Sequence, residues 1–458
     1  MRRGGSDRVT RFFYPIFYVQ IMVAILFVAY FAQQAGGSDA LWLPIAWDTP
    51  YHVLRSIVSI GMLTFTLLFI IRHVVLVVCA TADEVERSSF ERRLRKLDVE
   101  PFQPLVSIIV PAYNEGIVIE ASIRSLLALD YPAYEVIVID DGSSDDTLTR
   151  AQTLEGQHGP ANVQVFWKPN GGKASALNYG IERAAGEFCV TVDSDSVLEP
   201  QTLKEAVRHM QDPIVGAVAG KVVVANTVNL WTRLQALEYL KGLNLVRKAQ
   251  SFVRAVSIVP GPIGMFRKSA LRAVGGYETD TFAEDCDLTL KLLCDGWKIA
   301  YEPRAVSHTE APEDILSLTK QRYRWTRGIL QSIKKHWRFM LTPSKSLTGA
   351  MVLWYQAFEA FCWPVLTMLS VAFLAFSGFD ATLRPAVAYL WLQLMLLDLA
   401  VALFCVGVEE QDLDLVLYTP VDRIVFQIML DIGKLLATVE ELLGIRMGWG
   451  KLERKGKI

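Results

Sequence analysis

The chain lacks the cysteine patterns that mark disulfide scaffolds and zinc sites. Its 458 residues include six cysteines, at scattered positions and never in a C-x-x-C arrangement. We therefore interpret them as reduced and mostly buried thiols. An excess of one charge is also lacking, because 46 Lys and Arg residues oppose 48 Asp and Glu residues. This balance gives no basis for predicting nucleic acid as a partner.

Motifs of the common phosphate-binding loops are missing as well. No G-x-G-x-x-G sequence occurs. The segment "NGGKAS" (170–175) lacks the first glycine of a Walker loop and the Ser or Thr that follows its lysine. Any nucleotide site in this chain is therefore of neither of these two loop types.

Long apolar runs are present instead, since 52% of the residues are hydrophobic and only 21% are charged. Residues 14–33 carry no charge and are long enough to cross a bilayer, and residues 56–79 form a second candidate span. We therefore predict two transmembrane helices within residues 1–81. The basic N-terminus "MRRGGSDRVTR" favours a cytoplasmic start, which also places the middle of the chain in the cytoplasm.

The C-terminal third contains further apolar runs, and we predict two or three transmembrane helices within residues 349–446. Residues 349–377 and 385–408 are strong candidates, whereas residues 422–444 are weaker because charged side chains interrupt them. The basic tail, residues 447–458, favours the cytoplasm, yet three full crossings would place it outside. Either one segment does not cross the membrane, or the tail breaks the rule.

Some charged residues lie inside these apolar runs, namely Glu359, Asp398, Asp431 and Lys434. Such charges usually face the interior of a helix bundle, so a translocation channel is one interpretation and a simple membrane anchor is the other. Asp431 and Lys434 are three residues apart on one helical face, and this spacing predicts that they pair.

Residues 105–340 read as a soluble α/β domain, preceded by a charged, helical linker at 82–104. Apolar strand-like runs alternate with helical patterns, which favours a mostly parallel, doubly wound sheet. The four predicted strands are residues 105–111, 134–141, 163–168 and 187–193. We also predict an interfacial helix near residues 316–340, where an amphipathic pattern adjoins the membrane segments.

Polar motifs follow the carboxyl ends of these strands, where ligands bind in such sheets. Asp193 and Asp195 are two residues apart in an extended segment, so their carboxylates can converge on one point. Two hard oxygen ligands suit Mg²⁺ or Mn²⁺, especially when phosphate completes the shell, although a solvated turn also explains the pair. Lys173 can neutralise phosphate, and Asp140 and Asp141 can accept hydrogen bonds from a nucleoside or cap a helix.

Two further clusters carry candidate chemistry. Glu284 and Asp285 precede a helical pattern, where acidic residues suit the helix dipole but one of them can also act as a general base. Arg324 can bind a diphosphate with its forked guanidinium, and Trp325 can stack on a sugar ring. An amphipathic membrane-surface helix would also explain this second cluster.

Taken together, these motifs resemble those of the family-2 processive glycosyltransferases, which include the synthases of cellulose, chitin, hyaluronan and poly-N-acetylglucosamine. The resemblance covers residues 104–335. The segments that carry it are "VSIIVPAYNEG", "VIVIDDGSSDDT", "NGGKASALN", "DSDS", "AEDCD" and "QRYRW".

The resemblance implies a Rossmann-like GT-A fold, an inverting reaction and a UDP-sugar donor. It also implies roles for individual residues. The catalytic residues are Asp285 and Glu284; the nucleotide-sugar ligands are Ala112, Tyr113, Glu115, Asp140, Asp141, Lys173, Asp193 and Arg324; the metal ligands are Asp193 and Asp195; and the acceptor ligands are Gln321, Trp325, Gly261 and Pro262. The family's Thr-Glu-Asp motif reads Ala-Glu-Asp here, and we take the carboxylates as its essential part.

The stretch 261–305 most resembles the poly-N-acetylglucosamine branch of bacterial synthases. We therefore predict a multi-pass enzyme of the plasma (inner) membrane, in contact with its lipids, that polymerises N-acetylglucosamine from UDP-N-acetylglucosamine and exports the growing polysaccharide. The alternatives are a non-processive transferase with a lipid acceptor, a synthase of another β-glycan, and a non-enzymatic membrane protein. The sequence leaves open whether a small membrane subunit takes part.

Overall fold

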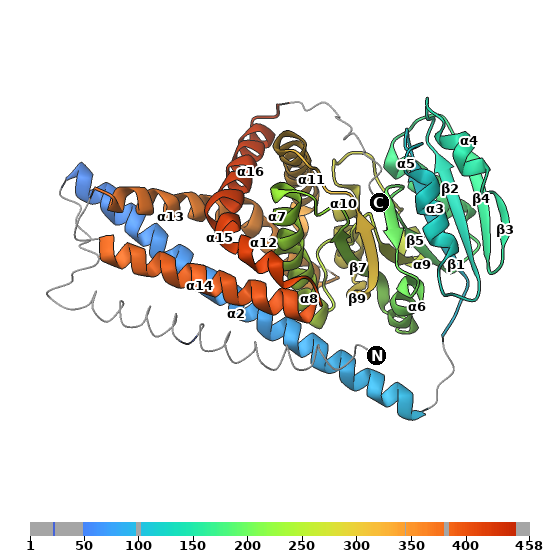
Figure 1. The fold of residues 1–458 in the computed structure, drawn as a ribbon, viewed down its shortest axis with the longest axis horizontal. Coiled ribbons are helices and arrows are strands. Elements are labelled where there is room, and N and C mark those ends of the chain that lie inside the picture. Colours follow the sequence, from blue (N-terminus) through green and yellow to red (C-terminus); the bar gives the residue numbers. More distant parts are fainter. Residues whose placement is uncertain (1–21, 23–48, 98–101, 344, 380–383, 446–458) are drawn as a thin grey trace.

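A computed structural model describes residues 22, 49–97, 102–343, 345–379 and 384–445. A domain with a central sheet adjoins a group of long helices (Figure 1). The predicted span at 14–33 and the basic tail at 447–458 lie outside the described residues, apart from Met22.

The sheet has nine strands in the order β3-β4-β2-β1-β5-β8-β7-β9-β6. Six of them, β4, β2, β1, β5, β7 and β9, point the same way, so the prediction of a mostly parallel sheet is confirmed. The strands are β1 Val106–Ala112, β2 Tyr134–Asp140, β3 Gly156–His158, β4 Ala161–Trp167, β5 Phe188–Thr191, β6 Ser196–Leu198, β7 Val215–Val224, β8 Gly264–Arg267 and β9 Lys298–Thr309. The four predicted strands correspond to β1, β2, β4 and β5.

Helices cover both faces of the sheet, which explains why its central strands are continuous apolar runs. Along β1, Ile108 belongs to the same buried cluster as Ile123 of α3, whereas Ile109 belongs to the cluster of Leu177 of α5. Successive side chains thus enter opposite layers of the core. The helices of this domain are α3 Ile119–Leu127, α4 Thr147–Gln152, α5 Lys173–Arg183, α6 Thr202–Val207, η1 Arg208–Gln211, α7 Leu230–Glu238, η2 Tyr239–Asn244, α8 Leu245–Phe252, α9 Lys268–Ala273, α10 Glu284–Asp295 and α11 Ile315–Leu341.

The second predicted span and residues 82–97 of the linker form one continuous helix, α2, of 48 residues from Pro50 to Leu97. Residues 82–97 continue the helix because they contain no proline or glycine and most are Ala, Leu, Glu, Arg or Lys, which favour helices. Two ion pairs attach this extension to the sheet domain: Glu84 with Lys248 at 2.6 Å and Arg87 with Glu302 at 3.3 Å. This part of the linker is therefore fixed against the sheet domain.

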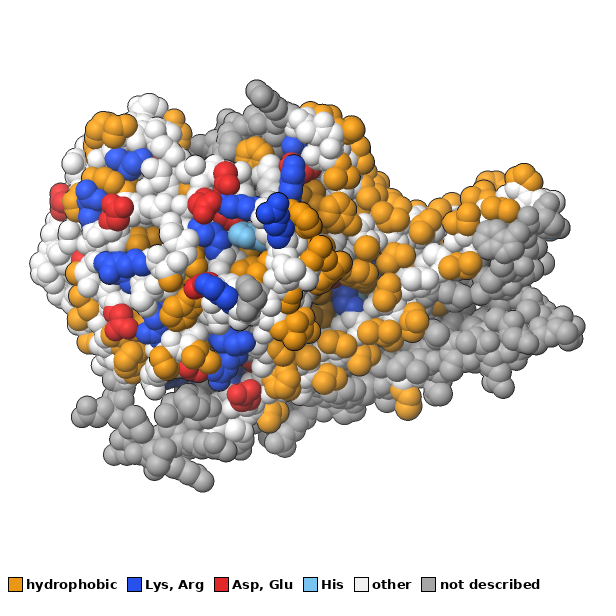
Figure 2. All heavy atoms as spheres, turned by 180° about the vertical axis from the view of Figure 1, so that it is seen from behind, with side chains coloured by type: hydrophobic (Ala, Val, Ile, Leu, Met, Phe, Trp, Pro, Cys, Tyr) orange, Lys and Arg blue, Asp and Glu red, His pale blue; other side chains and the backbone are white. Residues whose placement is uncertain are grey.

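Within the described residues, three helical stretches are long and apolar enough to cross a membrane: Ile60–Ser89, Leu347–Ser377 and Leu390–Val408. The first belongs to α2. The second comprises α12 Leu347–Ala357, a π-helical turn η3 Phe358–Cys362, and α13 Trp363–Ser377, and the third is part of α14 Arg384–Val408. Hydrophobic side chains cover much of the surface of these long helices, whereas charged side chains gather over the sheet domain (Figure 2).

The weaker candidate at 422–444 is not among these stretches. It consists of α15 Thr419–Val421, a π-helical turn η5 Asp422–Phe426, and α16 Gln427–Leu442, after the 3₁₀ helix η4 Leu413–Tyr418. Both of its ends lie against the sheet domain. Near its start, Asp422 pairs with Lys241 of η2 at 2.9 Å, and at its end Glu441 pairs with Arg327 of α11 at 2.7 Å.

The packing of α5 on β1 leaves no room for a side chain at Gly180. A Cβ atom there would lie 2.5 Å from Cγ2 of Ile109, a fully buried side chain. We expect Gly180→Ala to destabilise the protein by about 1–3 kcal/mol through overpacking. Gly433→Ala in α16 is the control, since its Cβ would meet no atom within 4 Å. Thermal unfolding of the detergent-solubilised variants measures both, and equal midpoints would contradict this packing.

Candidate active site

A cavity of about 670 Å³ lies at the carboxyl ends of β1, β2 and β5, as predicted for a ligand site in this sheet. It brings together residues that are up to 213 positions apart in the chain, Pro111 and Arg324. The predicted site residues that line it are Ala112, Tyr113, Glu115, Asp141, Lys173, Asp193, Asp195, Glu284 and Arg324.

The two aspartates at the end of β2 have different surroundings. Asp141 is buried and accepts hydrogen bonds from the backbone amides of Gly171 and Gly172, at 3.1 Å and 2.8 Å, and from Lys168 at 2.5 Å. It therefore fixes the loop that leads to Lys173. Asp140 accepts from the backbone amide of Ser143 at 3.2 Å, and its second carboxylate oxygen is buried without a partner in the described part of the chain.

Lys173 connects two acidic groups across the cavity. It is the first residue of α5, and its amino group lies 2.6 Å from Asp193 and 3.2 Å from Glu284. Burial alone would lower the pKa of Lys173, but the carboxylates of Asp193 and Glu284 outweigh it and raise this pKa. Gly261 lies beside this pair, because a Cβ atom there would come within 2.7 Å of the Lys173 nitrogen. The predicted residue Pro262 is partly exposed and does not line the cavity.

Asp193 and Asp195 fit a divalent cation. Both line the cavity, and its volume leaves space for a diphosphate beside them. The extended segment expected from the sequence is a turn at Ser194 and Asp195, closed by a hydrogen bond from the Ser196 amide to the Asp193 carbonyl. Carboxylate and phosphate oxygens are the ligands that Mg²⁺ and Mn²⁺ prefer. In this structure the Lys173 ammonium group already supplies positive charge next to Asp193.

Asp285 follows Glu284 at the start of α10, beside the cavity rather than in its lining. Burial and then the negative charge of Glu284 raise the pKa of Asp285 to about 6, against the opposing effect of Lys173. A carboxylate that titrates near neutral pH is suited to take up a proton during a reaction.

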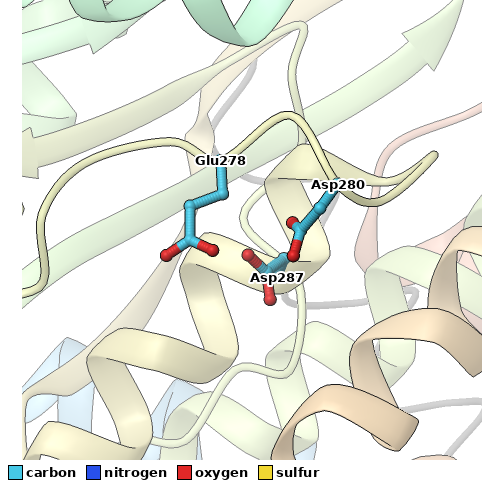
Figure 3. A group of neighbouring side chains, drawn as sticks. All are labelled: Glu278, Asp280 and Asp287. Atoms are coloured by element: carbon cyan, nitrogen blue, oxygen red, sulfur yellow. The ribbon is translucent and has the colours of Figure 1, made fainter.

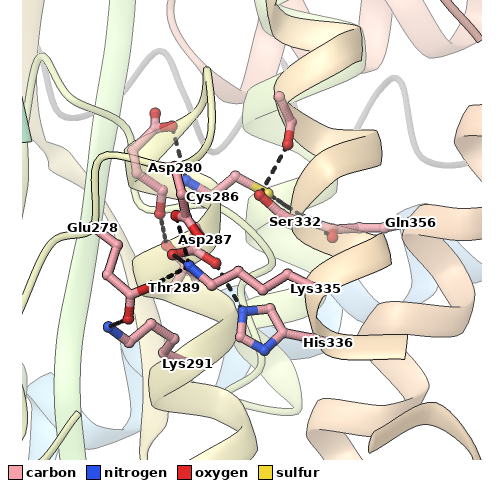
Figure 4. Close-up of polar contacts among 12 residues, drawn as sticks. Glu278, Asp280, Cys286, Asp287, Thr289, Lys291, Ser332, Lys335, His336 and Gln356 are labelled. Carbon is pink, nitrogen blue, oxygen red and sulfur yellow. Dashed lines mark hydrogen bonds and ion pairs between the residues drawn. The ribbon is translucent and has the colours of Figure 1, made fainter. Parts of the chain in front are cut away.

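A second acidic cluster, formed by Glu278, Asp280 and Asp287, was not predicted from the sequence. Its carboxylate oxygens lie within 4.8 Å of one another near the start of α10 (Figure 3), a spacing that can hold a metal ion. Lys335 of α11 supplies positive charge there, at 2.8 Å from Asp280 and 2.9 Å from Asp287 (Figure 4). His336 also contacts Asp287, at 2.8 Å. We interpret this cluster as an ionic connection between α10 and α11.

The helix α11 joins the first cavity to a second one. Arg324 lines the first cavity, whereas the neighbouring Trp325 lines the second, which measures about 330 Å³ and extends between the membrane helices. The Arg322 guanidinium lies 4.2 Å from the centroid of the Trp325 ring and 2.6 Å from Glu238. The predicted residue Gln321 is buried and accepts a hydrogen bond from Arg322 instead of lining either cavity.

The charged residues predicted inside the apolar runs are all paired in this structure. The Asp431–Lys434 pair is confirmed at 2.8 Å. The partners of the other two come from distant segments: Glu359 pairs with Arg72 at 2.8 Å, and Asp398 pairs with Lys241 at 3.1 Å and Arg423 at 3.0 Å.

Comparisons with known proteins show what the sheet domain resembles. Residues 103–328 match the family model described as "Glycosyltransferase like family 2". The poly-beta-1,6-N-acetyl-D-glucosamine synthase of Staphylococcus epidermidis is 31% identical over 275 residues, which are 60% of this chain and 66% of that synthase. The Staphylococcus aureus protein of the same name is 30% identical over 267 residues, covering 58% and 63% of the two chains. The matched region thus spans slightly less than two thirds of these relatives.

The predicted GT-A fold is confirmed by a solved structure, that of a mannosyltransferase from Pyrobaculum calidifontis in complex with GDP-Man and Mn²⁺. It is 24% identical, with a TM-score of 0.56, and the match covers 82% of this chain and 99% of that one. At this identity the likeness concerns the fold alone. Residues 103–328 thus resemble glycosyltransferases of family 2, and they lie against helices that are long and apolar enough to span a membrane.

Proposed function

We propose that this chain is a processive, inverting glycosyltransferase that polymerises N-acetylglucosamine from UDP-N-acetylglucosamine into a β-linked polysaccharide. The observation that carries the proposal is the pair of cavities on either side of Arg324 and Trp325. The first cavity has the cationic and acidic residues that a nucleotide diphosphate requires, and the second leads from an aromatic side chain into the membrane helices. The staphylococcal relatives support N-acetylglucosamine as the sugar.

In the proposed reaction, the acceptor hydroxyl attacks the anomeric carbon of the donor from the side opposite the leaving group. Asp285 takes the proton of that hydroxyl, the new glycosidic bond forms, and the bond to the diphosphate breaks to release UDP. Negative charge then develops on the diphosphate. Arg324 and Lys173 line the cavity in which the diphosphate would lie. Their fixed positive charge would stabilise the transition state.

Asp193 and Asp195 would hold the divalent cation, Mg²⁺ or Mn²⁺, which supplies further positive charge to the diphosphate when bound. Lys173 then serves a second purpose. Because its ammonium group already neutralises Asp193 and Glu284, the donor site retains its shape before the cation and nucleotide arrive.

The membrane helices have a matching role in this proposal. The sheet domain lies in the cytoplasm, the protein crosses the plasma (inner) membrane several times, and the growing chain passes Trp325 into the second cavity for export. The segment 419–442 does not cross, since Asp422 near its start and Glu441 at its end both pair with residues of the sheet domain. This arrangement leaves two C-terminal crossings and returns the basic tail to the cytoplasm, in agreement with the positive-inside rule.

We expect Asp285→Asn to lower sugar transfer by at least about 100-fold, because general-base catalysis typically contributes 10²–10⁴-fold. UDP binding should remain, since Asp285 does not line the donor cavity. Incorporation of labelled sugar and calorimetric titration with UDP measure the two effects. The control is Asp295→Asn at the other end of α10, where Asp295 pairs with Lys345 on the surface. A parallel loss of UDP affinity would remove Asp285 from the role of base.

The pH dependence of transfer should report Asp285. Since its pKa is about 6 and the base must be ionised, the rate should fall about tenfold per pH unit below pH 6. Glu284→Gln removes a negative neighbour that raises this pKa, so the acidic limb of the rate profile should move to lower pH. Rate profiles of the purified enzyme between about pH 4 and 8, where carboxylates and histidines titrate, measure this movement. A shift of the acidic limb to higher pH in Glu284→Gln would contradict the assignment.

Metal removal should abolish polymerisation. We expect EDTA to stop sugar incorporation and added Mg²⁺ or Mn²⁺ to restore it. In Asp193→Ala, the same cations should no longer increase the affinity for UDP, because a metal ligand is lost. Asp280→Ala in the second acidic cluster is the control, and it should retain the metal response because Lys335 already compensates that cluster. Polymerisation that is unaffected by the chelator would refute a metal at Asp193 and Asp195.

A further inference from the structure

Arg247 is a buried cation in the wall of the second cavity. It belongs to α8, only 7% of its surface is exposed, and its side chain is part of the cavity lining. In the described part of the chain it forms no hydrogen bond or ion pair, and its Nη1 atom is buried without a partner. A guanidinium group has five N–H donors and no acceptor, so this side chain has several hydrogen bonds left to donate.

The other Lys and Arg side chains that line this cavity all have carboxylate partners. The pairs are Arg72 with Glu359, Lys241 with Asp398, Arg322 with Glu238, Arg423 with Asp398, and Lys434 with Asp431. Lys241 also contacts Asp422, at 2.9 Å. Among the described residues, Arg247 is therefore the exception in a cavity whose charges are otherwise compensated.

Burying an uncompensated charge is costly, and a protein gains nothing in stability from it. Desolvation accordingly lowers the pKa of Arg247, although Tyr301, Asp285 and Tyr239 act in the opposite direction. A buried polar group without a partner calls for an explanation, and a bound ligand is one that fits a cavity wall.

We propose that Arg247 binds the acceptor end of the glycan by donating hydrogen bonds to the acetamido carbonyl oxygen of its terminal sugar. This inference rests on the proposed function. The amide carbonyl is a stronger hydrogen-bond acceptor than a sugar hydroxyl, and it suits a permanently charged donor. Trp325 lines the same cavity and offers a face on which the sugar ring can stack. Arg247 would thus select acetylated acceptors and hold their reactive end towards Asp285.

The test compares Arg247→Met with wild type, using N-acetylglucosamine oligosaccharides and their deacetylated counterparts as acceptors. We expect the KM for acetylated acceptors to rise about 10- to 100-fold, the range for a hydrogen bond to a charged group. The preference of the wild type for acetylated acceptors should disappear in the variant. UDP affinity should stay at the wild-type value, because Arg247 does not line the donor cavity.

Thermal unfolding separates this role from a structural one. Removing an uncompensated buried charge should leave the unfolding midpoint unchanged or raise it, whereas loss of a structural arginine would lower it. Arg254→Met is the control, since Arg254 pairs with Asp212 on the surface and lines neither cavity. An unfolded Arg247→Met protein, an unchanged acceptor preference, or a wild type that prefers anionic acceptors would each overturn the inference. If wild-type protein does not consume UDP-N-acetylglucosamine at all, it is the proposed function that fails.

Discussion

The candidate active site depends on the compensation of negative charge at the carboxyl edge of the sheet. Four acidic side chains from two distant segments, Asp193, Asp195, Glu284 and Asp285, gather beside one cavity or in its wall. Carboxylates that gather beside one cavity repel one another strongly where little water surrounds them. Lys173 relieves the repulsion by contacting Asp193 and Glu284 together. The end of β5 and the start of α10 are thereby held in one arrangement.

The position of α11 then determines how the two halves of the molecule meet. Ionic contacts with Glu278, Asp280 and Asp287 attach it to the start of α10, and Arg327 attaches it to α16 through Glu441. The helix consequently presents Arg324 to the first cavity, the proposed donor site, and Trp325 to the second cavity, between the membrane helices. A bond made at the boundary between these cavities would place the product directly at the entrance of the second one.

Charge is treated differently in the two cavities. The first cavity has acidic side chains that suit a cation and a phosphorylated ligand. The charges of the second cavity form pairs instead, most of them between different helices. Paired charges leave a polar wall with little net field, which suits a neutral sugar polymer. Arg247 departs from this arrangement, since its Nη1 atom is buried without a partner in the described part of the chain.

The sequence by itself determined four of the nine strands, the apolar helices and the residue types at the strand ends. These features are local, because periodicity reveals a buried strand, whereas the turn that places Asp193 and Asp195 in the cavity wall was not foreseen. The sequence also indicated the Asp431–Lys434 pair, since its members are neighbours on one helix. Only the tertiary structure decided that α2 runs unbroken into the sheet domain, that 419–442 returns to it, and which charges find partners. Lys241 and Asp422, or Arg322 and Glu238, are far apart in the chain, and no local pattern specifies such contacts.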